Sequence, residues 1–96
     1  MRHTSAAPGY PVEQERVHEL ALARSLVDQI LEVVVREHLG CVTRVVLEIG
    51  AAAGVDADAL RLGFEIATQG SPVEGAELAI DTLPGGRDLR VTALEF

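Results

Sequence analysis

The sequence predicts an α+β fold in which two helices pack on a three-stranded mixed sheet, in the order α-β-α-β-β. Three observations indicate this architecture. Apolar residues recur at helical spacing across residues 18–38. Apolar and polar residues alternate, as in half-buried strands, across residues 43–50, 77–83 and 88–96. A second helical pattern follows Asp56, so helices and strands succeed each other within one small domain.

The first helix is expected to begin at His18 and to bury one apolar stripe. The stripe consists of Leu20, Ala23, Leu26, Val27, Ile30, Leu31, Val34 and Val35. Gly40 has the backbone freedom that a helix end commonly needs, so the helix should stop there. Residues 1–16 contain prolines and a glycine and show no hydrophobic period. We therefore expect a disordered N-terminal tail over residues 1–16 and a single domain over residues 17–96.

The second helix has a clear start signal. Asp56 is a favourable N-cap, and Asp58 in the first turn complements the helix dipole. Because this helix connects the first two strands, those strands should run parallel to each other. Gly70 and Pro72 end the helix and lead toward the next strand.

The last two strands are separated by the turn signal Pro84-Gly85-Gly86. This turn predicts that they form an antiparallel hairpin. The alternation of the final strand slips near Ala93, since Leu94 and Phe96 fall on the opposite parity. Either a bulge or a strand end covered on both faces explains the slip.

Composition restricts the class of protein. The chain has 96 residues, 48% of them hydrophobic, and a formal net charge of −7, which suits one modest core and disfavours nucleic acid as a partner. Its single cysteine, Cys41, excludes an internal disulfide and a cysteine-only zinc cage. No apolar run approaches the ~20 residues that span a bilayer, and residues 1–16 lack the apolar centre of a secretory signal. We expect a cytoplasmic protein without a membrane partner.

His18 and Glu19 are the candidate ligand pair. At a helix start the backbone N–H groups are not yet tied into helical bonds. An imidazole with adjacent backbone nitrogens forms fused chelate rings that suit Ni(II) or Cu(II). On composition alone, a His-Glu pair at a helix start more often consists of ordinary solvent-exposed residues without a ligand role. A small enzyme with Glu48 and Asp81 as acid and base is a weaker alternative, because both residues fit solvent-facing strand positions.

Several segments, in order, resemble the HypA/HybF family of nickel metallochaperones for [NiFe]-hydrogenase maturation. They are Val17-His18-Glu19-Leu20-Ala21-Leu22-Ala23, Val45-Val46-Leu47-Glu48-Ile49-Gly50, Val55-Asp56-Ala57-Asp58-Ala59-Leu60-Arg61, Glu74-Gly75-Ala76-Glu77-Leu78 and Leu89-Arg90-Val91-Thr92-Ala93-Leu94-Glu95. The resemblance covers essentially all of residues 17–96. It implies an accessory protein rather than an enzyme.

The resemblance also implies a transient Ni(II) site. His18 would supply its imidazole and backbone nitrogen, helped by the nitrogen of Val17 and by Glu19. The metal would be delivered to the hydrogenase large-subunit precursor with a GTPase partner, and family members also serve urease. The alternative is a degenerate interaction module that binds maturation partners without transferring metal. An exposed sheet edge is compatible with a homodimer.

This sequence departs from the family in two places. The family carries a zinc domain with two Cys-x-x-Cys pairs between the last two strands, whereas here residues 83–89 connect them directly. We therefore predict no zinc. Residues 1–16 precede the motif, and Val17 stands where the initiator methionine would be. Either the native chain starts at position 17 through a GTG codon, or the tail blocks the amine and nickel binding weakens.

Overall fold

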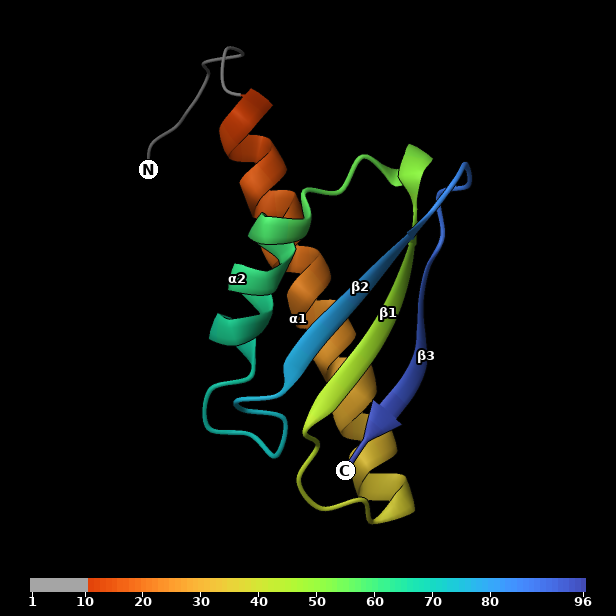
Figure 1. The fold of residues 1–96 in the computed structure, drawn as a ribbon. Helices are drawn as coiled ribbons and strands as arrows, with labels where there is room; N and C mark the ends of the chain where they lie inside the picture. Colours follow the sequence, from red (N-terminus) through yellow and green to blue (C-terminus); the bar gives the residue numbers. More distant parts are fainter. Residues whose placement is uncertain (1–10) are drawn as a thin grey trace.

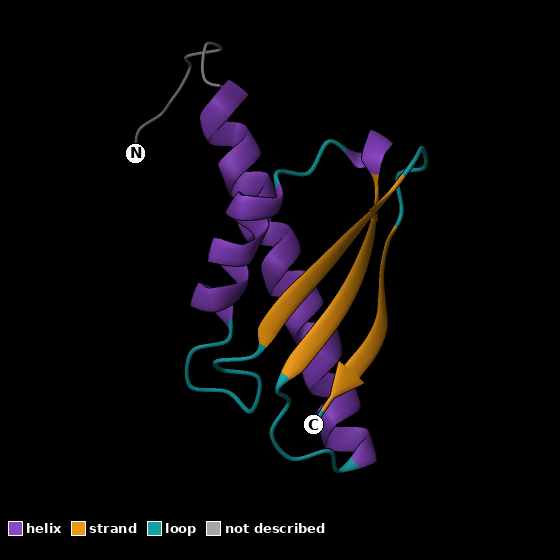
Figure 2. Cartoon of the chain, in the orientation of Figure 1, coloured by secondary structure: helices purple, strands orange, loops and turns teal. Residues whose placement is uncertain are grey.

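The protein is described here by a computed structural model, which covers the backbone of residues 11–96 and the side chains of residues 18–96. Its elements are α1 (Pro11–Glu37), β1 (Arg44–Gly50), the short 3-10 turn η1 (Ala51–Ala53), α2 (Ala57–Ala67), β2 (Glu77–Leu83) and β3 (Leu89–Glu95). α1 crosses one face of the sheet, and α2 lies beside α1 near β2 (Figures 1 and 2). The predicted α+β fold, two helices on a three-stranded mixed sheet, is confirmed.

α1 begins at Pro11, so the predicted helix start at His18 is wrong. Proline is well suited to the first helical position, because its φ is already helical and its missing N–H would have no partner there. The Glu-Gln-Glu-Arg run at positions 13–16 consists of good helix formers. The expected tail therefore overlaps the helix at residues 11–16, and residues 1–10 lie outside the described part of the chain.

The C-terminal end of α1 also differs from expectation. The helix ends at Glu37, and His38, rather than Gly40, is the first residue in the left-handed region, with φ 55°. The Leu39 N–H donates to the Val34 carbonyl at 3.1 Å, which is the six-to-one bond of a Schellman motif. Leu39 packs against the core, so closing this apolar contact ends the helix before the glycine is reached.

The core lies between α1, α2 and the sheet. Its buried members are Ala23, Val27, Ile30, Val34, Val42, Val45, Leu47, Ile49, Leu60, Phe64, Val73 and Leu78. The four buried apolar residues of α1 belong to the predicted stripe, but Val35 is 72% exposed because it falls at the edge of that stripe. Neither helix of residues 11–96 combines the length and the apolarity needed to cross a membrane.

β1 is the central strand of the sheet, whose order is β2-β1-β3. The predicted parallel pairing of β1 with β2 is confirmed. The predicted hairpin of β2 and β3 is wrong, because β3 pairs antiparallel with β1 instead. β1 carries the sequence RVVLEIG and is at least half-buried at every position. Placing this strand in the centre gives its backbone a hydrogen-bonding partner on both sides.

A β-bulge in β3 explains the slipped alternation. Val46 pairs with Ala93 and Leu47 pairs with Val91, so Thr92 is the extra residue. The bulge allows Leu94 and Val91, which have opposite parity in the sequence, to pair with the inward-facing Val45 and Leu47. The bulge is therefore confirmed as the correct one of the two predicted explanations.

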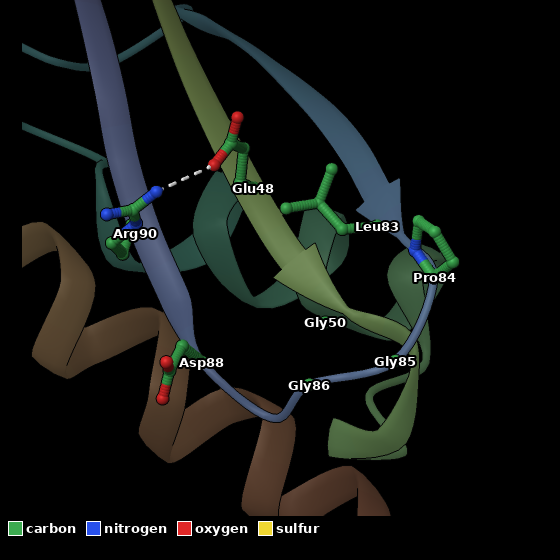
Figure 3. Close-up of a pocket in the computed structure, with 8 residues that line it drawn as sticks. All are labelled: Glu48, Gly50, Leu83, Pro84, Gly85, Gly86, Asp88 and Arg90. Carbon is green, nitrogen blue, oxygen red and sulfur yellow. Dashed lines mark hydrogen bonds and ion pairs between the residues drawn. The ribbon is translucent and has the colours of Figure 1, made fainter.

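The glycine turn between β2 and β3 passes over the end of β1 at Gly50 (Figure 3). The Gly50 N–H donates to the Asp88 carbonyl at 3.0 Å, and the Ala51 N–H donates to the Gly85 carbonyl at 3.1 Å. A Cβ atom at Gly50 would collide with the backbone carbonyl of Gly86 and would lie 2.8 Å from the Arg87 nitrogen. The crossing therefore requires a residue without a side chain at position 50.

Gly50→Ala is expected to destabilise the protein by about 3 kcal/mol, because backbone atoms rather than a flexible side chain must move aside. Urea unfolding measures the change. Gly54→Ala is the matched control: Gly54 has φ 69° with nothing within 4 Å of an added Cβ, so only the backbone cost of ~1 kcal/mol applies. Equal effects of the two substitutions would contradict the steric explanation.

The predicted N-cap of α2 is confirmed. The Asp56 side chain accepts from the backbone nitrogens of Asp58 at 3.0 Å and Ala59 at 3.2 Å. Asp56→Ala is expected to lower the free energy of unfolding by about 1 kcal/mol, because two N–H groups lose their acceptor. Asp56→Asn keeps an acceptor oxygen and should retain most of the stability. Thermal unfolding compares the two variants, and an Asn variant as unstable as the Ala variant would refute the capping role.

Candidate metal centre

The three candidate ligand residues lie within α1 rather than at its start. Val17, His18 and Glu19 come after the first four helical positions, and helix geometry pairs N–H groups at such positions with carbonyls one turn earlier. Consecutive side chains on a helix point about 100° apart. His18 and Glu19 therefore face different surroundings, although they are adjacent in the sequence.

His18 is exposed on the surface of α1. Its imidazole is open to a metal ion from solvent. The main-chain nitrogens that would complete a chelate belong to the helical backbone in this conformation. The expectation that these nitrogens sit unpaired at a helix mouth is therefore wrong for the helix as it stands.

Glu19 is buried, with 2% of its surface exposed. Its Oε2 atom accepts a hydrogen bond from the backbone N–H of Asp56 at 2.8 Å. Its Oε1 atom is buried and has no hydrogen-bond partner among the described residues. Removing a carboxylate from water is costly unless its oxygens are satisfied, so this side chain stands out from the surrounding aliphatic core.

The Glu19–Asp56 bond completes a capping box across two helices. In a usual capping box, the third residue of the helix is Glu or Gln, and it binds the N–H of the N-cap residue. The third residue of α2 is Ala59, which has no such group, and Glu19 of α1 takes this role from 37 positions away in the chain. Sequence reasoning missed this contact. The alanine at position 59, in an otherwise well-capped helix, was the only local sign.

The other histidine and thiol of the described domain do not join these residues. His38 is exposed at the opposite end of α1, and Cys41 is exposed in the following loop. Within the described part of the chain, no group of three or more His, Cys, Asp or Glu side chains is arranged to hold a metal ion. A metal bound at His18 must therefore draw on main-chain donors or on atoms that move.

The second candidate location is a surface hollow of ≈ 360 Å³ at the end of β1 (Figure 3). Arg90 Nη2 lies 3.2 Å from Glu48 Oε1 in this hollow, and the Asp88 side chain points away from that pair. The Glu48 carboxylate therefore forms an ion pair with the Arg90 guanidinium. Asp81, the proposed catalytic partner of Glu48, pairs with it in register on β2 and is exposed, so the two carboxylates share no enclosed pocket.

Comparison with known proteins matches most of the described residues to one family. A family model described as hydrogenase/urease nickel incorporation, metallochaperone, hypA matches residues 17–95. The match starts at Val17 and includes the elements that surround Glu19 and Asp56.

Hydrogenase maturation factors HypA from several organisms are similar to the chain. The protein from Beijerinckia indica is 42% identical over 69 residues, which cover 72% of this chain and 61% of the relative. The protein from Azorhizobium caulinodans is 47% identical over 64 residues, covering 67% of this chain and 57% of the relative. The protein from Chloroflexus aurantiacus is 43% identical over 68 residues, which cover 71% of this chain and 60% of the relative. The matches thus span 57–61% of these relatives. The chain belongs to the HypA family of hydrogenase and urease nickel-incorporation metallochaperones.

Proposed function

We propose that this chain is a nickel-binding accessory protein that helps insert Ni(II) into the large-subunit precursor of a [NiFe]-hydrogenase. The observation that carries the proposal is the exposed His18 at the start of the family match. The protein acts by binding and transferring a metal ion rather than by catalysing a reaction. The GTPase partner and the precursor receive the metal in the cytoplasm, where the single exposed thiol of Cys41 stays reduced.

The metal donors are the His18 imidazole and main-chain nitrogens of the segment Val17-His18-Glu19. Imidazole and deprotonated backbone nitrogens form adjacent chelate rings in one plane, which is a geometry that Ni(II) accepts. In the helix these nitrogens are engaged in backbone bonds. Nickel binding therefore requires the helical turns before His18 to open, or a chain whose amine stands at Val17. Glu19, the last residue of this segment, assists the site.

We propose that this domain needs no zinc. The loop of residues 84–88 contains no cysteine, and its carbonyls are held by backbone N–H groups at the end of β1. Backbone hydrogen bonds therefore stabilise the connection between β2 and β3.

The proposed function predicts that the purified protein binds about one Ni(II) per chain and contains no stoichiometric zinc. His18→Ala should abolish nickel binding, because it removes the only side-chain donor in the proposed set. Isothermal titration calorimetry and elemental analysis measure both quantities. His38→Ala is the matched control, since His38 is also exposed but lies just beyond the far end of α1.

A second comparison tests the role of the upstream turns. The same chain beginning at position 17, with Val17→Met, should bind Ni(II) more tightly than the full chain because its amine is free. Equal nickel affinity of wild type and His18→Ala would contradict the proposed site. Equal affinity of the long and short chains would contradict the role of the amine.

The alternative function is an interaction module that binds maturation partners without transferring metal. It is favoured by the helical engagement of the nitrogens in the segment Val17-His18-Glu19. Deletion of the gene in the native host distinguishes nickel delivery from the interaction module. If the protein supplies nickel, excess nickel in the medium should restore hydrogenase activity to the deletion strain. A deletion strain that stays inactive at every tolerated nickel concentration would support the interaction module.

A further inference from the structure

We propose that Glu19 is a positioning residue of the nickel site: its carboxylate anchors the metal-binding segment to the N-terminus of α2 and does not ligate the metal. This inference rests on the proposed function and specifies how Glu19 takes part in it. The relevant side chain is acidic, is 2% exposed and accepts a hydrogen bond from a different helix.

The position of the carboxylate argues against direct ligation. His18 faces solvent, whereas Glu19 faces the interior between the helices. For Glu19 to reach a metal held by His18, its side chain would have to leave the interior and break the 2.8 Å bond to the Asp56 N–H. That N–H belongs to the N-cap residue of α2 and would lose its acceptor.

The N-terminus of α2 is a favourable place for the carboxylate. Helix N-termini carry partial positive charge and exposed N–H donors. The Asp56 side chain already satisfies two of these donors, those of Asp58 and Ala59, and Glu19 satisfies the N–H of Asp56 itself. The bond therefore joins a residue next to His18 directly to the start of another helix.

The backbone of Glu19 also lies close to α2. A Cβ atom at Gly63 of α2 would lie 3.5 Å from the Glu19 carbonyl oxygen and 3.3 Å from Leu20 Cα. The absent side chain at Gly63 thus lets α2 pack directly against the α1 backbone beside the metal-binding segment. When the turns before His18 open, Glu19 remains in place beside α2. The His18 imidazole and the neighbouring main-chain nitrogens then bind the metal next to this anchored residue.

The buried Oε1 atom supports a polar role rather than simple packing. It has no hydrogen-bond partner among the described residues, so this carboxylate is only half satisfied. An aliphatic residue of similar volume would avoid the desolvation cost. The acceptor at Oε2 is the feature that such a residue could not provide.

The experiment compares Glu19→Gln with Glu19→Ala in the full chain. Glutamine keeps an acceptor for the Asp56 N–H but is a poor metal ligand, whereas alanine removes both properties. If Glu19 is an anchor, Glu19→Gln should bind Ni(II) with the wild-type stoichiometry, within about threefold of the wild-type affinity and with an unchanged d–d absorption spectrum. Glu19→Ala should bind at least about tenfold more weakly.

Val27→Ala is the matched control for general destabilisation. Val27 is a core residue of α1 with 2% exposure, and its truncation should leave nickel affinity unchanged. Hydrogen exchange at the Asp56 amide provides a readout that needs no nickel. This amide should stay protected in Glu19→Gln and in Val27→Ala, and should exchange at least about tenfold faster in Glu19→Ala.

Three results would overturn the anchor. The first is a loss of nickel binding in Glu19→Gln as large as in Glu19→Ala, which identifies a carboxylate ligand. The second is wild-type affinity in Glu19→Ala, and the third is unchanged Asp56 exchange in that variant. Undiminished binding in His18→Ala would instead refute the proposed nickel site, and the exchange measurement alone would then decide whether Glu19 anchors the segment.

Discussion

The close approach of α1 and α2 is the contact on which the candidate site depends. Gly63 allows it, since a Cβ at this position would lie only 3.1 Å from that of Ala23. At this distance Glu19 is enclosed, and its carboxylate reaches the first N–H of the capped α2. The packing of the two helices therefore buries Glu19, which the sequence suggested was a surface ligand, and lets it connect α1 to α2 through a hydrogen bond. His18, one position earlier, stays in solvent.

The sheet is organised around β1 in a comparable way. At one end of the strand, Arg44 lies between Glu77 of β2 and Glu95 of β3, at 3.5 and 3.3 Å. These ion pairs are largely exposed and contribute little stability individually. At the other end, Gly50 lets the loop between β2 and β3 cross the strand. The loop therefore joins two strands that do not pair, which a tight hairpin turn could not do.

Local sequence signals were sufficient where the relevant contact is local. The N-cap Asp56, the start of α2 and the range of β2 follow from neighbouring residues and agree with the structure. The bulge at Thr92 was visible because it disturbs the alternation of its own strand. The predicted start of the first helix was wrong because the sequence signal at Pro11 is ambiguous. Proline breaks a helix in its interior but is favourable at the first helical position.

The sequence by itself determined the α+β class, the α-β-α-β-β order and the resemblance to nickel metallochaperones, because periodicity and motif residues are properties of short segments. Only the tertiary structure decided which strand lies in the centre and where the Glu19 carboxylate points. Alternation reports which face of a strand is buried but not which strand lies beside it. Likewise, the Glu19–Asp56 bond spans 37 positions and exists only because α2 docks on α1 at Gly63.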